Sequence, residues 1–188
     1  MFASLKPVIG AINGAAVGMG ATMTLPMDVR LASSTARFGF VFNRRGVVPE
    51  GASSWFLPRV VGISRTLEWC YSGRLIGADE ALAAGLVRSL HEPDELLPAA
   101  RQLAIELSQD SAPVSVALTR QMMWRMLGAT HPMEAHRIDS LGIHVRAPSA
   151  DAAEGIASFL DKRAPAFPGR VSTDLPDIFP DWVEPQYG

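Results

Sequence analysis

The chain has 188 residues, of which 48% are hydrophobic and 19% charged, as is normal for a globular domain with a sizeable core. Its formal net charge of −2 gives no electrostatic reason to expect nucleic acid or an anionic membrane as a partner. The four histidines lack metal-binding spacing and Cys70 is the only cysteine, which predicts neither a metal site nor a disulfide framework. This fits a cytoplasmic location, with Cys70 as a small buried thiol.

An uncharged stretch at residues 7–27, preceded by Lys6, resembles a signal peptide or a membrane span. Its glycines, prolines and polar residues dilute the apolar character that a span needs. A buried strand followed by a buried helix is equally free of charge. We therefore expect no membrane insertion, and keep a membrane segment as the less favoured alternative.

The first part of the chain predicts an α/β layer. Residues 7–12 form a short apolar run that stops at Asn13-Gly14, which is typical of a buried strand. Residues 18–26 predict a tightly packed helix, and residues 29–32 and 36–40 predict two more strands. A strand-helix-strand unit this short implies parallel pairing.

Helical patterns dominate after Pro49, apart from one predicted strand at residues 86–90. Gly85 is the expected left-handed stop before that strand, and Ser149 is the expected cap of the last helix. The tail at residues 165–188 is predicted to wrap a surface or to be loosely ordered. The predicted helices are residues 51–61, 64–71 and 78–84, one that begins after Asp94 and carries an apolar stripe to Leu107, then residues 113–126 and 150–163.

Residues 13–20 form a glycine-rich turn between a predicted strand and a predicted helix. The turn matches neither the phosphate loop nor the dinucleotide fingerprint. Outward-facing backbone amides at such a turn suit a carbonyl oxygen that gains negative charge. Close helix packing would also require small residues, so the pattern by itself leaves both interpretations open.

Motifs with a recognisable spacing continue along most of the chain. They are residues 6–18, Ala36–Gly39 and Arg59–Gly62, followed by residues 72–74, 78–81, 85–87 and 154–163. Together these motifs resemble the crotonase (enoyl-CoA hydratase/isomerase) superfamily, up to about Phe167. The resemblance implies an α/β fold of the ClpP/crotonase type, a ββα spiral core that is truncated at its N-terminus and followed by a helical region.

The same resemblance implies a domain organisation and a set of partners. Residues 1–90 would form part of the spiral core, residues 91–167 a helical trimerisation region, and residues 168–188 a proline-rich tail. We expect an acyl-CoA substrate and a homotrimer or hexamer, with no nucleic acid, membrane, metal or redox cofactor. The family's N-terminal half, with much of the CoA-binding surface and one of two oxyanion amides, is expected to be missing.

In this family two backbone amides bind the thioester oxygen, and the resemblance assigns one of them to Met19, between Gly18 and Gly20. Hydratases carry glutamates at the positions that are Thr22 and Phe42 here. A pair of carboxylates that could activate water is therefore absent.

The same resemblance assigns Gly18 and Gly20, together with four other residues, to substrate binding. Thr22 and Phe42 occupy the two positions just described. Phe159 and Lys162 lie on the last predicted helix, where family members touch the adenine and phosphate of CoA. A lysine is a suitable phosphate ligand, although a lysine on a terminal helix is as often only solvated.

Glu50 is the candidate catalytic residue. It lies in Val48–Ser54, which resembles the segment of Δ3,Δ2-enoyl-CoA isomerases whose glutamate after proline is the sole acid/base. The resemblance implies that Glu50 takes a proton from C2 of a 3-enoyl-CoA and returns it at C4, while the oxyanion amides hold the dienolate. From the residues alone, Glu50 also suits the first turn of a helix.

Three alternatives remain beside the isomerase. The chain could be a hydratase-like member, or a hydrolase or dehalogenase that uses Glu50 as a nucleophile. It could also be an inactive packing partner, since the expected second oxyanion segment is missing.

Overall fold

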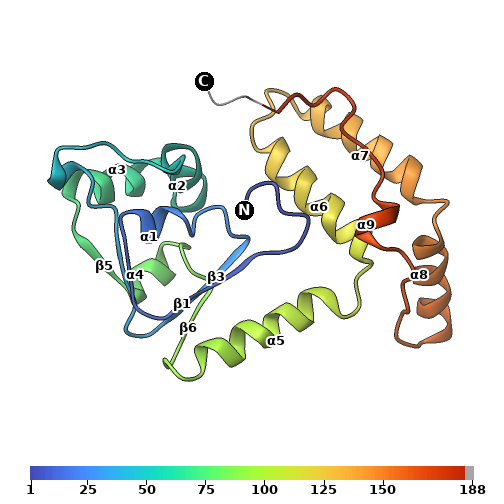
Figure 1. Ribbon diagram of the computed structural model, residues 1–188, viewed down its shortest axis with the longest axis horizontal. Coiled ribbons are helices and arrows are strands. Elements are labelled where there is room, and N and C mark those ends of the chain that lie inside the picture. The colour runs from blue at the N-terminus through green and yellow to red at the C-terminus, as the bar shows by residue number, and fades with distance from the viewer. Residues whose placement is uncertain (185–188) are drawn as a thin grey trace. The chain divides into compact units, whose positions relative to one another are not determined.

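The chain divides into two compact units. The first comprises Met1–Phe2 and Val8–Ile105, and the second comprises Ala3–Pro7 and the chain from Glu106 onward. The computed structural model describes residues 1–184 (Figure 1). Within these residues, every strand belongs to the first unit.

One sheet of the first unit is fully parallel. Its strands are β1 (Ile9–Ile12), β3 (Val29–Ser33) and β6 (Ser89–His91), in the order β1-β3-β6. Ile9 lies opposite Val29 in this register. The sheet confirms the strands predicted at residues 7–12 and 29–32 and their parallel pairing, whereas the strand predicted at residues 86–90 begins three residues later, at Ser89.

A second sheet carries the turn that leads to the candidate site. Its strands are β2 (Ala15–Val17), β4 (Arg37–Gly39) and β5 (Leu75–Gly77). β2 and β4 are parallel, whereas β4 and β5 are antiparallel. Only β4 was predicted, because three residues are too few for a periodic pattern to distinguish a strand from a turn.

The helix predicted at residues 18–26 is shorter than expected. α1 covers only Met19–Thr22. Beyond it, the amides of Thr24 and Leu25 bond to carbonyls three residues back, and Pro26 has no amide hydrogen to continue the ladder. The other helical segments of this unit are η1 (Asn43–Arg45), α2 (Ser53–Val61), α3 (Ile63–Ser72), α4 (Ala78–Ala83) and most of α5 (Leu96–Ser108).

α5 covers the parallel sheet. Leu96 and Leu103 on this helix form a buried cluster with Leu31 of β3, and Ile9 and Val29 pack against the cluster. The apolar stripe predicted after Asp94 therefore faces the strands, as its spacing indicates.

Arg30, on β3, fixes the segment that follows α1. Its guanidinium donates hydrogen bonds to the carbonyl oxygens of Leu86, Thr24, Leu25 and Met27, the last at 2.6 Å. Desolvation lowers the pKa of Arg30, and the charge of Asp28 opposes this shift. Because three of the four carbonyls lie at residues 24–27, Arg30 also holds the chain where α1 ends.

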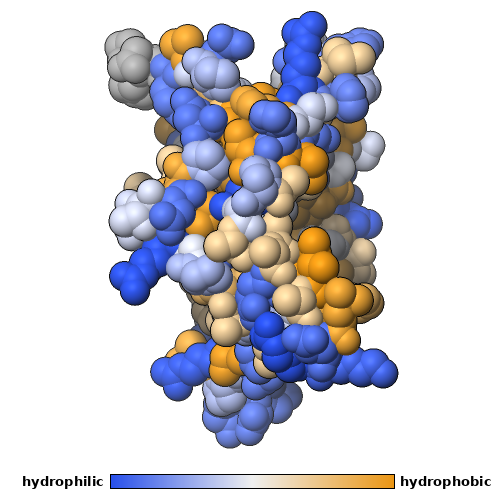
Figure 2. All heavy atoms as spheres, turned by 90° about the vertical axis from the view of Figure 1, so that its right-hand side faces the viewer, coloured by the Kyte–Doolittle hydropathy of each residue, from blue (hydrophilic) through white to orange (hydrophobic). Residues whose placement is uncertain are grey.

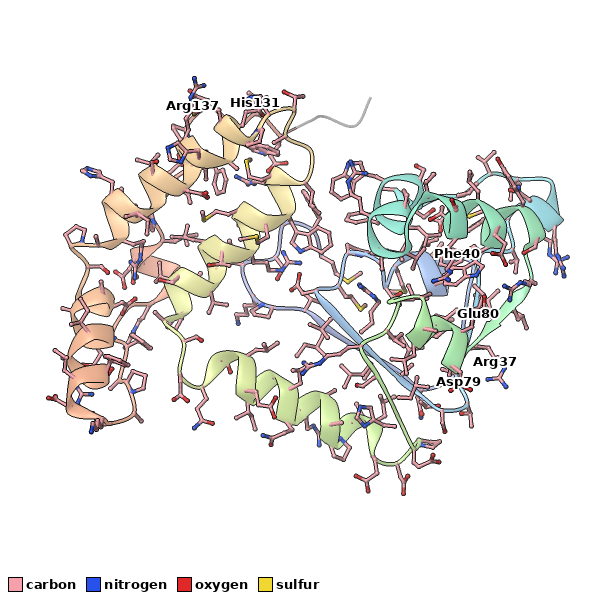
Figure 3. All side chains as sticks on the ribbon, turned by 180° about the vertical axis from the view of Figure 1, so that it is seen from behind. Arg37, Phe40, Asp79, Glu80, His131 and Arg137 are labelled. Atoms are coloured by element: carbon pink, nitrogen blue, oxygen red, sulfur yellow. The ribbon has the colours of Figure 1, made fainter. Side chains whose placement is uncertain are left out.

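Trp69, on α3, joins this helix to α4. Its ring is fully buried and stacks on Phe40 with 6.1 Å between ring centroids. The indole nitrogen donates to Glu80 Oε1 at 2.9 Å. Glu80 and Phe40 are both labelled in Figure 3. Arg74 donates twice to the same carboxylate, and these hydrogen bonds are the main reason that the pKa of Glu80 is lowered.

The described part of the second unit is helical. It contains α6 (Pro113–Met126), α7 (Pro132–Arg146), α8 (Ala150–Asp161) and the short α9 (Val171–Asp174). Ser149 caps α8 as predicted, because its hydroxyl accepts from the amide of Ala152. Gly85, between α4 and β6 in the first unit, has the predicted left-handed conformation.

The tail packs on α6 within the described residues. Ile178 is fully buried against Val114 and Leu118, and Leu175 and Phe179 pack on the same cluster. Residues 175–179 therefore lie against a surface, which is the first of the two predicted alternatives. Residues 185–188 lie outside the described part of the chain.

The membrane alternative finds no support in residues 1–184, where no helix has the length and apolar character to cross a bilayer. Residues 7–27 fold instead into β1, β2 and α1. Cys70 is buried as predicted, and desolvation raises the pKa of its thiol. The described residues contain no group of three or more histidine, cysteine or acidic side chains placed to hold a metal ion.

Candidate active site

The glycine-rich turn connects β2 to α1. Gly18 donates from its amide to the carbonyl of Gly39 on β4 at 2.9 Å, and its φ of 57° and ψ of −123° are readily adopted only by glycine. Met19 and Gly20 begin α1, where backbone amides have no carbonyl partner within the helix. The turn therefore presents two amide donors beside the exposed Met19 side chain.

Glu50 is bonded to this helix. Thr22 Oγ1 donates to Glu50 Oε1 at 2.5 Å, across 28 positions of the sequence. Thr22 is buried, with 1% of its surface exposed, whereas Glu50 is exposed. Thr22 Oγ1 is also 3.3 Å from the carbonyl oxygen of Met19. The structure thus brings together the predicted acid/base and the predicted amide turn.

The backbone of Glu50 is fixed as well as its side chain. Its carbonyl oxygen accepts from the amide of Ser53 at 3.0 Å and from the hydroxyl of Ser53 at 2.6 Å. Ser53 is the first residue of α2 and is buried. No motif predicted a role for Ser53, although a serine three residues after a glutamate at a turn is a recognisable signal for such a bond.

Two successive left-handed residues separate Glu50 from α2. Gly51 has φ of 61° and Ala52 has φ of 55°. The conformation of Ala52 costs roughly 1 kcal/mol because its Cβ approaches the backbone. Strained backbone of this kind is concentrated at functional sites, where surrounding contacts hold it in place.

Exposed apolar side chains lie along the chain on both sides of the Thr22–Glu50 bond. Met19 and Met23 on the α1 side are 70% and 51% exposed, and Val47 and Val48 before Glu50 are 55% and 77% exposed. Apolar surface next to a polar pair is suited to a ligand with both an acyl chain and a carbonyl group.

The remaining predicted site residues lie elsewhere. Phe42 is buried at the start of η1. The position where hydratases carry their second glutamate therefore holds a phenyl ring in this chain. Phe159 is 82% exposed on α8, and Lys162 ends that helix with a left-handed φ of 53°. Both belong to the second unit.

A carboxylate held by the helix that begins with these backbone amides suits proton transfer next to a carbonyl group. The family model for enoyl-CoA hydratase/isomerase matches residues 1–170. The chain therefore belongs to the enoyl-CoA hydratase/isomerase family, which confirms the predicted superfamily.

Individual relatives agree with this membership. The chain is 42% identical to enoyl-CoA hydratase ACTT3 of Alternaria alternata over 163 residues, covering 86% of this chain and 54% of that protein. It is 32% identical to 1,2-epoxyphenylacetyl-CoA isomerase of Escherichia coli (strain K12), covering 88% of this chain and 62% of that protein. The chain thus spans a little over half the length of these relatives.

Solved structures share the fold. A probable enoyl-CoA hydratase/isomerase from Mycobacterium abscessus superposes with a TM-score of 0.85 at 32% identity, covering 90% of this chain and 66% of that chain. A second, an enoyl-CoA hydratase from Bacillus anthracis, gives a TM-score of 0.84 at 28% identity, covering 88% of this chain and 64% of that chain. These matches confirm the predicted crotonase-type α/β fold.

Proposed function

We propose that this chain acts on a fatty enoyl-CoA and moves its double bond from the 3,4 to the 2,3 position, with Glu50 as the acid/base. The observation that carries this proposal is the Thr22–Glu50 hydrogen bond, which holds a single carboxylate against the helix that begins with Met19. The amide of Met19, between Gly18 and Gly20, is the proposed donor to the thioester oxygen.

In the proposed reaction, the Glu50 carboxylate removes a proton from C2 of the 3-enoyl-CoA. The C2–H electrons pass into a dienolate whose negative charge rests on the thioester oxygen, where backbone amides stabilise it. The same carboxyl then returns the proton at C4, and the double bond ends between C2 and C3. Protons and electrons balance without a metal or redox cofactor, so we propose that none is needed.

Thr22 and Phe42 replace the two glutamates of hydratases, and this favours isomerisation over hydration. Hydration through a pair of carboxylates requires acidic groups that hold and activate a water molecule. Here one position is a hydroxyl bonded to Glu50, and the other is a buried phenyl ring. One mobile proton is sufficient for a double-bond shift.

A hydratase-like activity is the second candidate, and the name of the 42%-identical Alternaria protein favours it. In that case Glu50 alone would activate the water. The two activities differ in the substrate that they consume, since the isomerase acts on a 3-enoyl-CoA and the hydratase on a 2-enoyl-CoA.

An assay of the purified chain with each thioester separately tests the proposal. We expect 3-enoyl-CoA to give 2-enoyl-CoA, detected by chromatography and by the gain of conjugated absorbance. Conversion of 2-enoyl-CoA to a 3-hydroxyacyl-CoA, with no reaction of the 3-enoyl-CoA, would instead support the hydratase. Release of free CoA would point to a hydrolase that uses Glu50 as a nucleophile.

We further propose that Phe159 and Lys162 contribute to the CoA site and that the chain forms a homotrimer or hexamer. Ile156, Phe159 and Leu160 lie on one face of α8 and are 64%, 82% and 71% exposed. Figure 2 looks onto the side that carries α7 and α8 and shows hydrophobic surface among charged residues. Such a face is suited to burial against another copy of the chain.

A further inference from the structure

We propose that Thr22 is a positioning residue that holds Oε1 of Glu50, so that Oε2 is the oxygen that carries the proton. This inference rests on the proposed isomerase function and deepens it. The resemblance assigned Thr22 to substrate binding, whereas the contacts of its hydroxyl indicate that it acts through Glu50.

The Thr22 hydroxyl is enclosed by the segment that it holds. Only 1% of the residue is exposed. A Cβ atom at Gly51 would lie 3.2 Å from Thr22 Oγ1, so the backbone after Glu50 also packs against the hydroxyl. Gly51 has a left-handed φ, which a side chain would disfavour in any case. The hydroxyl is therefore confined where it meets the carboxylate.

The direction of the hydrogen bond follows from the two available acceptors. A threonine hydroxyl has one hydrogen, and an ionised carboxylate can only accept. Glu50 Oε1 lies at 2.5 Å from Thr22 Oγ1, whereas the Met19 carbonyl oxygen lies at 3.3 Å. The hydrogen therefore points to Oε1, where the charge makes the bond stronger.

The second carboxylate oxygen is left available. Glu50 Oε2 has no hydrogen-bond partner in residues 1–184, and the residue is exposed. When Oε2 takes the proton from C2, Oε1 becomes the carbonyl oxygen of a neutral carboxyl and still accepts from Thr22. The anchoring bond is thus kept in both protonation states, while Oε2 serves C2 and then C4.

Two substitutions separate the hydroxyl from the shape of the side chain. Thr22→Val keeps the branched shape and removes the donor, whereas Thr22→Ser keeps the donor and removes the methyl group. In Thr22→Val we expect kcat to fall about 10- to 100-fold, with KM changed less than about twofold, because a misplaced base slows proton transfer more than binding. We expect the Thr22→Ser variant to keep a kcat within about threefold of the wild-type value.

A measurement without turnover tests the anchor itself. The ¹³Cδ resonance of Glu50 at pH 7, assigned by its loss in Glu50→Gln, should move in Thr22→Val and stay near its wild-type position in Thr22→Ser. An unmoved resonance in Thr22→Val, an equal shift in Thr22→Ser, or an unchanged kcat in Thr22→Val would each overturn the inference. If the wild type does not isomerise 3-enoyl-CoA, the proposed function fails, and the resonance still decides whether Thr22 anchors Glu50.

Discussion

Ala52, two residues after Glu50, has a left-handed backbone conformation that alanine disfavours. Ala52 has φ of 55° and ψ of 22° at the start of α2, directly after Gly51 in a similar conformation. The buried Ser53 bonds to the carbonyl of Glu50 and closes this turn from the other side. The strained Ala52 therefore lies between Glu50, which Thr22 and Ser53 hold, and the start of α2.

Replacing Ala52 by glycine should stabilise the protein. Glycine adopts the left-handed conformation without the Cβ clash, and the gain of roughly 1 kcal/mol is reduced by the larger entropy of glycine in the unfolded chain. We expect Ala52→Gly to raise the free energy of unfolding by up to about 1 kcal/mol, measured by urea denaturation.

The control is the same substitution in a normal helix. Ala153 is an exposed residue of α8, where glycine should lower the free energy of unfolding by roughly 0.5–1 kcal/mol. Equal destabilisation by Ala52→Gly and Ala153→Gly would show that Ala52 is not strained.

At the residue scale, the sequence predicted the participants of the candidate site and not their contact. Glu50 and Thr22 were each chosen from family motifs. Their hydrogen bond joins positions 28 apart and depends on the shortened α1 and the left-handed turn at residues 51–52. Local patterns in a sequence do not encode such a long-range approach.

Among the elements, α8 shows how a charged residue fixes a helix end. Glu154 accepts from Arg163 at 2.6 and 2.9 Å and from the amide of Ala166 at 2.6 Å. The hydrogen bonds from Arg163, followed by that from Ala166, lower the pKa of Glu154 to about 2 from its ordinary value of 4.5. The chain after α8 is thereby folded back onto the helix.

This contact predicts a pH dependence of stability. Because the pKa of Glu154 is lower in the folded than in the unfolded state, its contribution is complete above pH 4.5 and is lost as the pH falls towards 2. We expect the melting temperature of the wild type to exceed that of Glu154→Gln at pH 7, and the difference to shrink between pH 4.5 and 2.

Glu92→Gln serves as the control for this titration, since Glu92 is an exposed residue shortly before α5. Its melting temperature should follow the wild type throughout. A wild-type advantage over Glu154→Gln that is the same at pH 7 and at pH 2 would contradict the assignment.

The helix at residues 113–126 was predictable, whereas α7 and the short strands β2 and β5 were not. The helix predicted at residues 113–126 matches α6, because Pro113 marks its first turn. α7 was missed, although His131 accepts from the amide of Met133 and Pro132 begins the helix. Histidine is an uncommon N-cap. β2 and β5 were too short for any periodicity to appear.

For the molecule as a whole, the exposed apolar face of α8 bears on assembly. If Ile156, Phe159 and Leu160 are buried between copies, a charge at Leu160 would have to be desolvated on association. We expect Leu160→Asp to shift the protein from a trimer or hexamer towards the monomer in sedimentation velocity. Ile63→Asp, at a position on α3 that is 60% exposed, is the control for added charge and should leave the sedimentation coefficient unchanged. A wild-type chain that sediments as a monomer would contradict the proposed assembly.

The fold of the whole molecule followed from motifs spread along the chain rather than from any single element. The family match over residues 1–170 and the TM-scores above 0.8 confirm that prediction. The domain boundaries at residues 90 and 167 stay predictions. The packing of Ile178 onto α6 was not foreseeable in detail, because the tail has no periodic pattern that selects a partner.

The role of Glu50 is tested most directly by Glu50→Gln, which keeps the shape of the side chain and removes the base. With 3-enoyl-CoA as substrate, the account predicts that kcat falls by about 10² to 10⁴-fold, because a general base contributes acceleration of that size. Glu95→Gln, at an exposed position before α5, should retain the wild-type rate. A Glu50→Gln protein that isomerises 3-enoyl-CoA as fast as the wild type would contradict the account.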